Sequence, residues 1–225
     1  MPSLAALAVL FVVYAGSAVV FGRALGITNK SLRSLQLTAP MVETQLLGYI
    51  PVLIYLTLVL PALARRSLRE ILGRFGAREL LAGLGGAILM WLAVATVGAL
   101  EAALLGHTPN QLAVRLFERA HPGLLLDLMI AVAVLVAPFA EELVFRGFIF
   151  NAIRVRASFP VAATLSGLLF GAAHGEAAGI LPLAAGGFVL ASVYARTGSL
   201  WSSIVAHGSF NGFTLLLLLS TGIKT

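Results

Sequence analysis

Long apolar stretches alternate with short polar connectors along the whole chain of 225 residues. A helix needs about 20 mostly apolar residues to cross a bilayer, and the stretches approach that length. They lie at about 4–22, 46–64, 80–105, 124–141 and onward, 160–174, 178–195 and 200–221. The pattern predicts an all-α, polytopic transmembrane helix bundle with seven spans, or eight if one stretch is broken at a Gly or Pro.

The first apolar stretch, 4–22, resembles a signal peptide in hydropathy. No positive charge precedes it, however, and it fills the length of a span. These properties favour a retained first transmembrane helix over a cleaved leader.

The polar connector at 65–79 contains five arginines. Its Leu68, Ile71, Leu72 and Phe75 recur at helical spacing, which predicts an amphipathic helix on the membrane surface. Positive charge favours the cytoplasmic side, so the connector and the N-terminus are expected to be cytoplasmic. The same alternation puts the arginines at 154, 156 and 196 inside, but it leaves those at 115 and 119 outside, against the rule.

The composition agrees with this interpretation. Hydrophobic residues make up 60% of the chain and charged residues only 11%, and the mean hydropathy is +1.00. Such values are typical of a multi-pass protein, here expected in the cell membrane with the lipid bilayer as partner. The net charge of +6 does not indicate nucleic acid, because the basic residues are not interleaved with aromatic ones. The absence of cysteine excludes thiol catalysis and thiolate metal sites.

Ionisable side chains inside apolar stretches are the main candidates for function, because a bilayer tolerates them poorly. In the segment EELVFR, Glu142 and Arg146 are four residues apart and can pair on one helix face. Glu141 is rotated by about 100° from Glu142, so it is expected to do the chemistry while Arg146 offsets its neighbour. For this segment alone, a structural ion-pair network is the stronger interpretation. The remaining ionisable candidates are Glu101, Asp127, His174, Glu176 and His207.

Two further segments place polar groups one helical turn apart. In FGAAH, Phe170 and His174 share a helix face, and in HGSFN, His207 and Asn211 do so. A histidine and an asparagine aimed at one point can stabilise an oxyanion, although hydrogen bonding between helices is the ordinary alternative. Together the three segments supply a carboxylate base, a histidine partner and two donors, as a hydrolytic site requires.

Other protease chemistries fit less well. No HExxH string occurs, and Asp127 is the single aspartate, which excludes an aspartyl dyad. No GxSxG motif surrounds the serines near the histidines, which are better interpreted as small packing residues; they are Ser166, Ser203 and Ser209. A zinc site built from Glu141, His174 and His207 has suitable ligand types but no compact spacing, so it ranks below a site without cofactor.

EELVFRG, FGAAH and HGSFN, in this order, resemble the motifs of the CAAX protease and bacteriocin-processing family of intramembrane proteases. The resemblance covers residues 124–221 well and the first hundred residues only in hydropathy. It suggests N-terminal transmembrane helices over 1–123 and a catalytic helix core over 124–225.

The resemblance implies hydrolysis of a peptide bond of a membrane-associated protein or peptide by a glutamate-activated water. It gives Glu141 and His174 the activation of water, and His207 and Asn211 the stabilisation of the oxyanion. Supporting residues would be Glu142, Arg146 and Phe170. Two other functions stay open: a non-proteolytic scaffold or immunity protein of the same fold, and an ion-coupled transporter, for which no internal repeat is visible.

Overall fold

The computed structural model describes residues 37–59, 61–62, 65–106, 112–174 and 179–222. Every regular element in these ranges is helical, so the predicted all-α class is confirmed for the described part of the chain. The predicted first span at 4–22 lies outside the described residues, as does Glu176.

Five helices within the described ranges are long and apolar enough to cross a membrane, as expected of a multi-pass membrane protein. They are Ala39–Val59, Ala77–Leu105, Leu124–Arg154, Ile180–Thr197 and Leu200–Thr221. A further apolar helix, α11 (Phe159–Ala173), has 15 residues and is shorter than a typical span. The predicted total of seven to eight spans is therefore not confirmed.

The helix that carries EELVFR is continuous but changes its hydrogen-bonding pattern along its length. Two π-helical segments alternate with α-helical ones, and short π segments are frequent at functional sites. In chain order the segments are α8 (Leu124–Ala131), η2 (Val132–Val136), α9 (Ala137–Glu142), η3 (Leu143–Phe150) and α10 (Asn151–Arg154).

The chain divides into two compact units. Among the described residues, the first comprises 67–106, 141–174 and 179–210, and the second comprises 37–59, 61–62, 65–66, 112–140 and 211–222. Two helices, those that carry EELVFR and HGSFN, continue from one unit into the other. The division predicted from the sequence at residues 123 and 124 stays a prediction.

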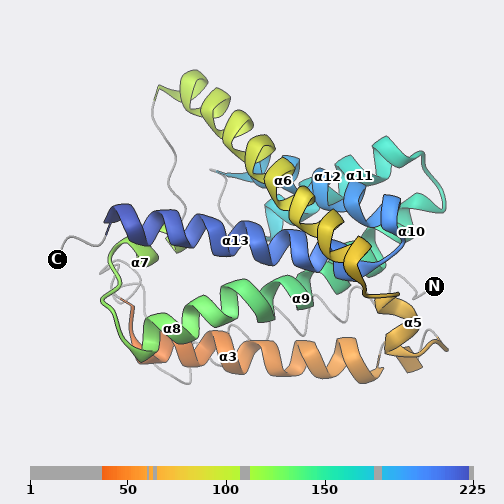
Figure 1. Cartoon of the computed structure of the whole chain (residues 1–225), viewed down its shortest axis with the longest axis horizontal. Helices are drawn as coiled ribbons and strands as arrows, with labels where there is room; N and C mark the ends of the chain where they lie inside the picture. Colours follow the sequence, from red (N-terminus) through yellow and green to blue (C-terminus); the bar gives the residue numbers. More distant parts are fainter. Residues whose placement is uncertain (1–36, 60, 63–64, 107–111, 175–178, 223–225) are drawn as a thin grey trace. The chain divides into compact units, whose positions relative to one another are not determined.

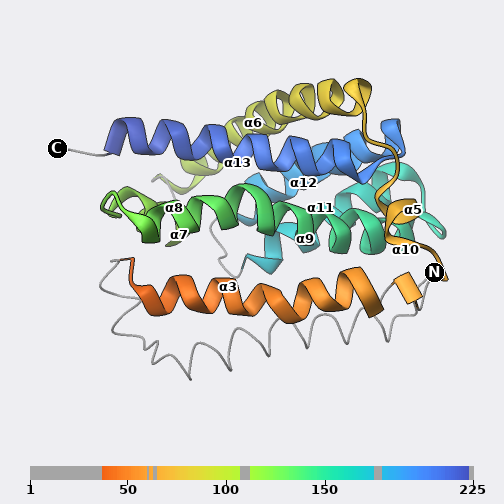
Figure 2. The same cartoon turned by 60° about the horizontal axis from the view of Figure 1, so that its bottom comes forward.

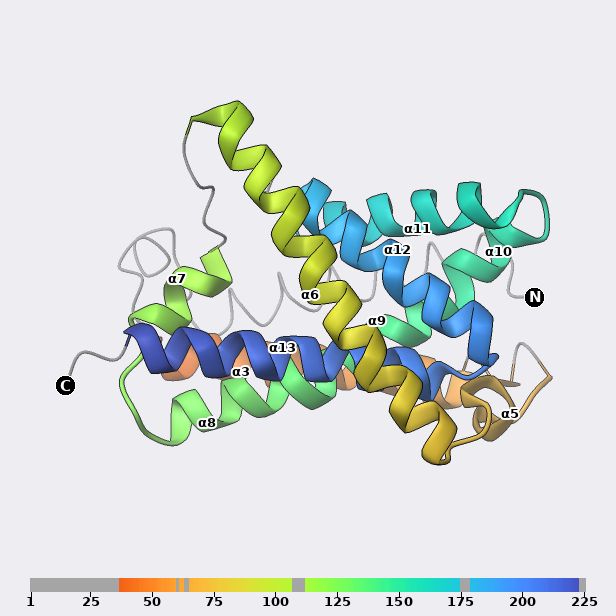
Figure 3. The same ribbon diagram turned by 45° about the horizontal axis from the view of Figure 1, so that its top comes forward.

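Within the first unit, α11 and α12 (Ile180–Thr197) lie side by side (Figure 3). Small residues allow this approach: a Cβ added at Gly167 would lie 2.5 Å from the carbonyl oxygen of Ala184, and one added at Gly187 would lie 2.8 Å from Gly167 Cα. Close contact through glycine is typical of helix pairs in membranes. The long helix α6 (Ala77–Leu105) crosses α12 (Figure 1).

The connector at 65–79 is not one amphipathic helix, as the sequence suggested. The helical part is α5 (Leu68–Leu72), which begins with a capping box between Ser67 and Glu70. It ends at Gly73, whose φ of 79° lies in the left-handed region that glycine adopts without strain. The prediction was wrong about the length because this glycine and Gly76, the N-cap of α6, interrupt the periodic apolar pattern.

Within the second unit, α3 (Ala39–Ile54) lies beside α8 (Figure 2). The unit has its own apolar core, in which α7 (Leu112–Glu118) and the end of α13 (Leu200–Gly222) take part. The buried members of this core are Phe117, Ala120, Leu126 and Leu215.

Candidate active site

The two acids of EELVFR lie where an α-helix gives way to a π-helix. Glu141 and Glu142 are the last residues of α9, and Arg146 lies in η3. A π-helix bonds each N–H to the carbonyl five residues earlier, so its side chains are spaced differently from those of an α-helix. Glu142 and Arg146 nevertheless meet across four residues, as the sequence spacing predicted.

Arg146 is fully buried and contacts three groups. Its Nη1 donates to Glu142 Oε1 at 2.8 Å, and both side chains are 0% exposed. Its Nη2 donates to the carbonyl oxygen of Gly187 in α12 at 2.7 Å. The guanidinium carbon lies 4.9 Å from the centre of the Phe170 ring, within the range of a cation–π interaction. The arginine therefore offsets the charge of Glu142 and connects the EELVFR helix to both α11 and α12.

His207, in α13, lies between the two glutamates. Its Nδ1 is 3.1 Å from Glu142 Oε1, and its Nε2 is 3.9 Å from Glu141 Oε2. The two acids differ in exposure, since the Glu141 side chain is 21% exposed and that of Glu142 is 0% exposed. The contact of His207 with Glu142 was not expected from the sequence, because the two residues are 65 positions apart.

Phe170 joins the two histidines of the site. Its buried ring lies 5.0 Å from the imidazole of His174 and 5.5 Å from that of His207, in edge-on geometry. His174 is the C-cap residue of α11, and its Nδ1 is 2.9 Å from the carbonyl oxygen of Phe170. If Nδ1 donates to that carbonyl, a neutral His174 has Nε2 as its acceptor. The expected position of Phe170 beside His174 is observed, with His207 on the same ring.

Asn211 belongs to the second unit, although it follows His207 by one turn in α13. Its side-chain nitrogen donates to the carbonyl oxygen of Ala133, in η2, at 2.7 Å. This bond uses one of the two amide hydrogens. The role expected for Asn211 at an oxyanion stays a prediction.

Asn151 and Tyr194 support the site and were not predicted from the sequence. The Asn151 side-chain nitrogen lies 2.8 Å from the carbonyl oxygen of Arg146 and 3.1 Å from that of Gly147, and it lies 3.0 Å from the Tyr194 hydroxyl. Asn151 therefore binds the backbone of η3 at the residue that holds Glu142. A clue was present in the sequence, since Asn151 is a polar residue inside an apolar stretch, but no partner at helical spacing pointed to its role.

The other polar candidates lie apart from these contacts except Ser203, whose hydroxyl lies beside the buried Glu142 carboxylate. Asp127 is exposed, and Glu101 is partly exposed. Ser166 Oγ donates to the carbonyl oxygen of Phe145 at 3.3 Å and Ser203 Oγ to that of Leu200 at 3.0 Å, as expected of small residues that pack helices together. Within the described ranges, no three His, Asp or Glu side chains gather closely enough to hold a metal ion.

Residues 124–213 match the family model described as type II CAAX prenyl endopeptidase Rce1-like. This part of the chain is therefore similar to the CAAX protease family. All seven residues singled out from the three motifs fall inside the matched segment.

The chain is also similar to a curated relative of Bacillus subtilis (strain 168), described as "Putative membrane peptidase YdiL". The two sequences are 38% identical over 92 residues, which is 41% of this chain and 38% of the relative. The match thus spans well under half the length of that relative. No solved structure matches the chain.

Proposed function

We propose that this chain is an intramembrane endopeptidase in which Glu141 activates a water molecule for hydrolysis of a peptide bond. The observation that carries the proposal is the position of His207 between Glu141 and a second acid, Glu142, whose charge a buried arginine already offsets. The matches to an Rce1-like endopeptidase model and to a relative named as a membrane peptidase support the reaction class.

The proposed reaction begins with proton transfer from water to the Glu141 carboxylate. The water oxygen forms a bond to the carbonyl carbon of the peptide, and the carbonyl electron pair moves onto its oxygen to give a tetrahedral oxyanion. When this intermediate collapses, the C–N bond breaks and the proton passes from Glu141 to the leaving amine. Glu141 is then a carboxylate again, and no covalent bond to the protein has formed.

Glu142 would act as a positioning residue for His207. A carboxylate that accepts a hydrogen bond from Nδ1 fixes the imidazole with Nε2 toward Glu141. With Nδ1–H bonded to Glu142, a proton on Nε2 would let His207 donate to the oxyanion. This assignment keeps the expected role of His207 and adds a reason for its orientation.

His174 and Asn211 complete the proposed reaction. Bonding of His174 Nδ1 to the Phe170 carbonyl leaves Nε2 to accept a hydrogen bond from the attacking water, beside Glu141. Asn211 would supply the second donor to the oxyanion through the amide hydrogen that it does not share with Ala133.

The substrate would be a membrane-associated protein or peptide, because Glu141 and His207 lie on helices long and apolar enough to cross a membrane. The proposed reaction uses no metal. We expect activity that resists chelators, and a chelator-sensitive activity restored by zinc would favour the alternative site of Glu141, His174 and His207.

The test compares peptides released in membranes that contain the wild type, Glu141→Gln or Asp127→Asn. Asp127→Asn is the matched control, because it removes an exposed carboxylate outside EELVFR. We expect a set of peptides common to the wild type and the control and absent from Glu141→Gln. Identical peptide pools in all three would support a non-proteolytic scaffold or immunity protein. Ion uptake by vesicles that depends on Glu141, without peptide release, would support a transporter.

A further inference from the structure

Two turns of the first unit are fixed to each other by Ser199. This residue precedes α13, and its Oγ lies 2.6 Å from the carbonyl oxygen of Arg74 and 3.2 Å from that of Leu72. Ser199 is 2% exposed, so these bonds are protected from water. The turn between α5 and α6 is therefore held against the turn between α12 and α13.

The backbones of these two turns also touch directly. A Cβ added at Gly73 would lie 3.1 Å from the carbonyl oxygen of Gly198, which is closer than nearly all real contacts of this kind. Both glycines have positive φ values, of 79° and 70°. We name residues 67–78 and 196–201 together the double turn.

The double turn presents an exposed aromatic side chain. Phe75 is 60% exposed, and its ring lies 5.5 Å from that of Trp201 in the first turn of α13. Aromatic side chains at the ends of apolar helices are enriched at the membrane–water interface. Two such helices, α6 and α13, begin at the double turn.

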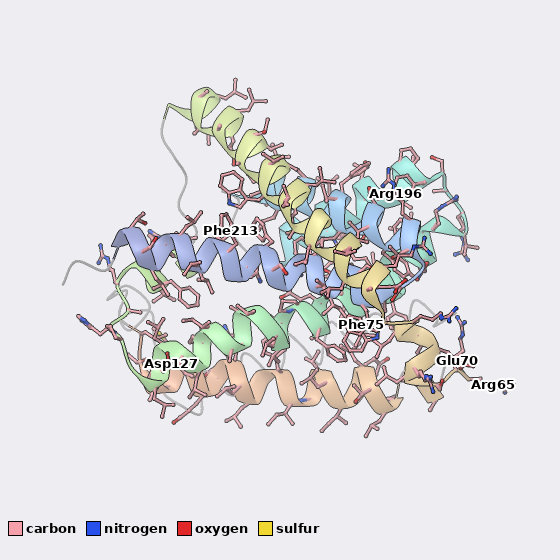
Figure 4. All side chains as sticks on the ribbon, viewed as in Figure 1. Arg65, Glu70, Phe75, Asp127, Arg196 and Phe213 are labelled. Carbon is pink, nitrogen blue, oxygen red and sulfur yellow. The ribbon has the colours of Figure 1, made fainter. Side chains whose placement is uncertain are left out.

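The double turn also carries positive charge. All four arginines of the double turn are exposed, and Figure 4 labels one of them together with Glu70 and Phe75. They are Arg69, Arg74, Arg78 and Arg196. One carboxylate opposes them within the double turn, that of Glu70, which accepts the Ser67 backbone N–H at 2.7 Å; Glu79 follows just beyond it.

We infer that the double turn binds the headgroups of anionic phospholipids. Charge complementarity selects this partner, since guanidinium groups recognise phosphate oxygens and an anionic leaflet attracts clustered arginines beside apolar helices. The ordinary explanation of such arginines is that they set the orientation of the chain in the membrane, which requires only positive charge in the connector. A binding surface requires in addition that the two turns be fixed together, and Ser199, Gly73 and Gly198 provide this.

The experiment titrates the full chain in detergent with phosphatidylglycerol or phosphatidylcholine of identical acyl chains and counts bound lipids by native mass spectrometry. We expect the wild type to prefer phosphatidylglycerol, by about fivefold for each arginine engaged. Arg74→Gln/Arg78→Gln should lose most of this preference. The matched control is Arg115→Gln/Arg119→Gln, which removes two exposed arginines of the second unit and should keep it.

Ser199→Ala separates the two explanations, because it removes the bond between the turns and leaves every arginine in place. We expect it to lower the preference as well. A preference equal to that of the wild type in Ser199→Ala, or its absence in the wild type, would overturn the inference.

A measurement on the wild type alone covers the case in which a variant does not fold. The preference should weaken as salt is raised, and inorganic phosphate at the lipid concentration should not compete. A preference insensitive to salt, or competition by inorganic phosphate, would contradict headgroup binding at a membrane surface.

Discussion

Arg146 and Arg154 lie on the same helix, but their surroundings differ completely. Arg146 is 0% exposed and binds Glu142, the carbonyl of Gly187 and the face of Phe170. Arg154 is exposed, and its Nη1 donates to the carbonyl oxygen of Ala157 three residues later. The comparison shows that position along one helix decides whether an arginine organises a site or caps a helix end. Replacing these residues and their neighbours tests that difference.

The largest effect is expected beside the buried arginine, at Glu141. Glu141→Gln removes the proposed base and keeps the size of the side chain, so peptide release should fall by about 100- to 10,000-fold. The rate of cleavage in purified, reconstituted protein measures this change. Full activity in the variant would disprove the proposed mechanism. Circular dichroism should show that the variant keeps the helix content of the wild type.

The second largest effect is expected on the stability of the protein when Arg146 or Arg154 is replaced. Arg146→Met leaves the Glu142 carboxylate buried without its cation, and we expect the free energy of unfolding to fall by about 3–5 kcal/mol. Arg154→Met, the matched control on the same helix, should change it by less than about 0.5 kcal/mol. Denaturant titration in mixed micelles measures both.

A double variant sharpens this result. In Arg146→Met combined with Glu142→Leu, no charge is left buried, so much of the lost stability should return while cleavage stays low. Equal losses of stability in the single and double variants would mean that the loss is caused by missing packing around Arg146 and not by the unpaired, buried Glu142 carboxylate.

A smaller change is expected at Asn211. Asn211→Ala removes one proposed oxyanion donor, which lowers the turnover number on the order of 100-fold with little change in KM. Steady-state kinetics separates the two parameters. A rise in KM with an unchanged turnover number would instead assign Asn211 to substrate binding.

The smallest effect is expected at Tyr194. Tyr194→Phe removes the hydroxyl that accepts from Asn151, at a cost of about 1 kcal/mol in the free energy of unfolding. Asn151→Leu should cost more, because it also removes the donor to the Arg146 carbonyl. The order of the two midpoints in thermal unfolding checks this, and the reverse order would show that Asn151 does not support η3.

The sequence predicts much of this architecture because apolar length and polar spacing are local properties. The helices around Glu141, Phe170 and His207 and the pairing of Glu142 with Arg146 follow from hydropathy and from four-residue spacing. The placement of His207 against both acids does not follow, since it depends on how α13 packs within the first unit.

Other features could not be predicted from the sequence, each for a specific physical reason. A π-helical segment has no strong compositional signal, so η3 was not predicted. The contact of Arg146 with the Gly187 carbonyl depends on the absence of a side chain at residue 187 and is invisible to charge patterns. The end of the helix at Gly73 was not predicted, because the apolar residues keep helical spacing on both sides of this glycine.

The glycine contacts between α11 and α12 bear on where the proposed peptide substrate could enter. The backbones of the two helices approach so closely at Gly167 and Gly171 that not even a methyl group fits between them, which leaves no room there for a substrate segment. Sliding of α12 along its axis would also break its bond to Arg146. If the chain cleaves peptides as proposed, the substrate therefore reaches the site along helices other than this pair.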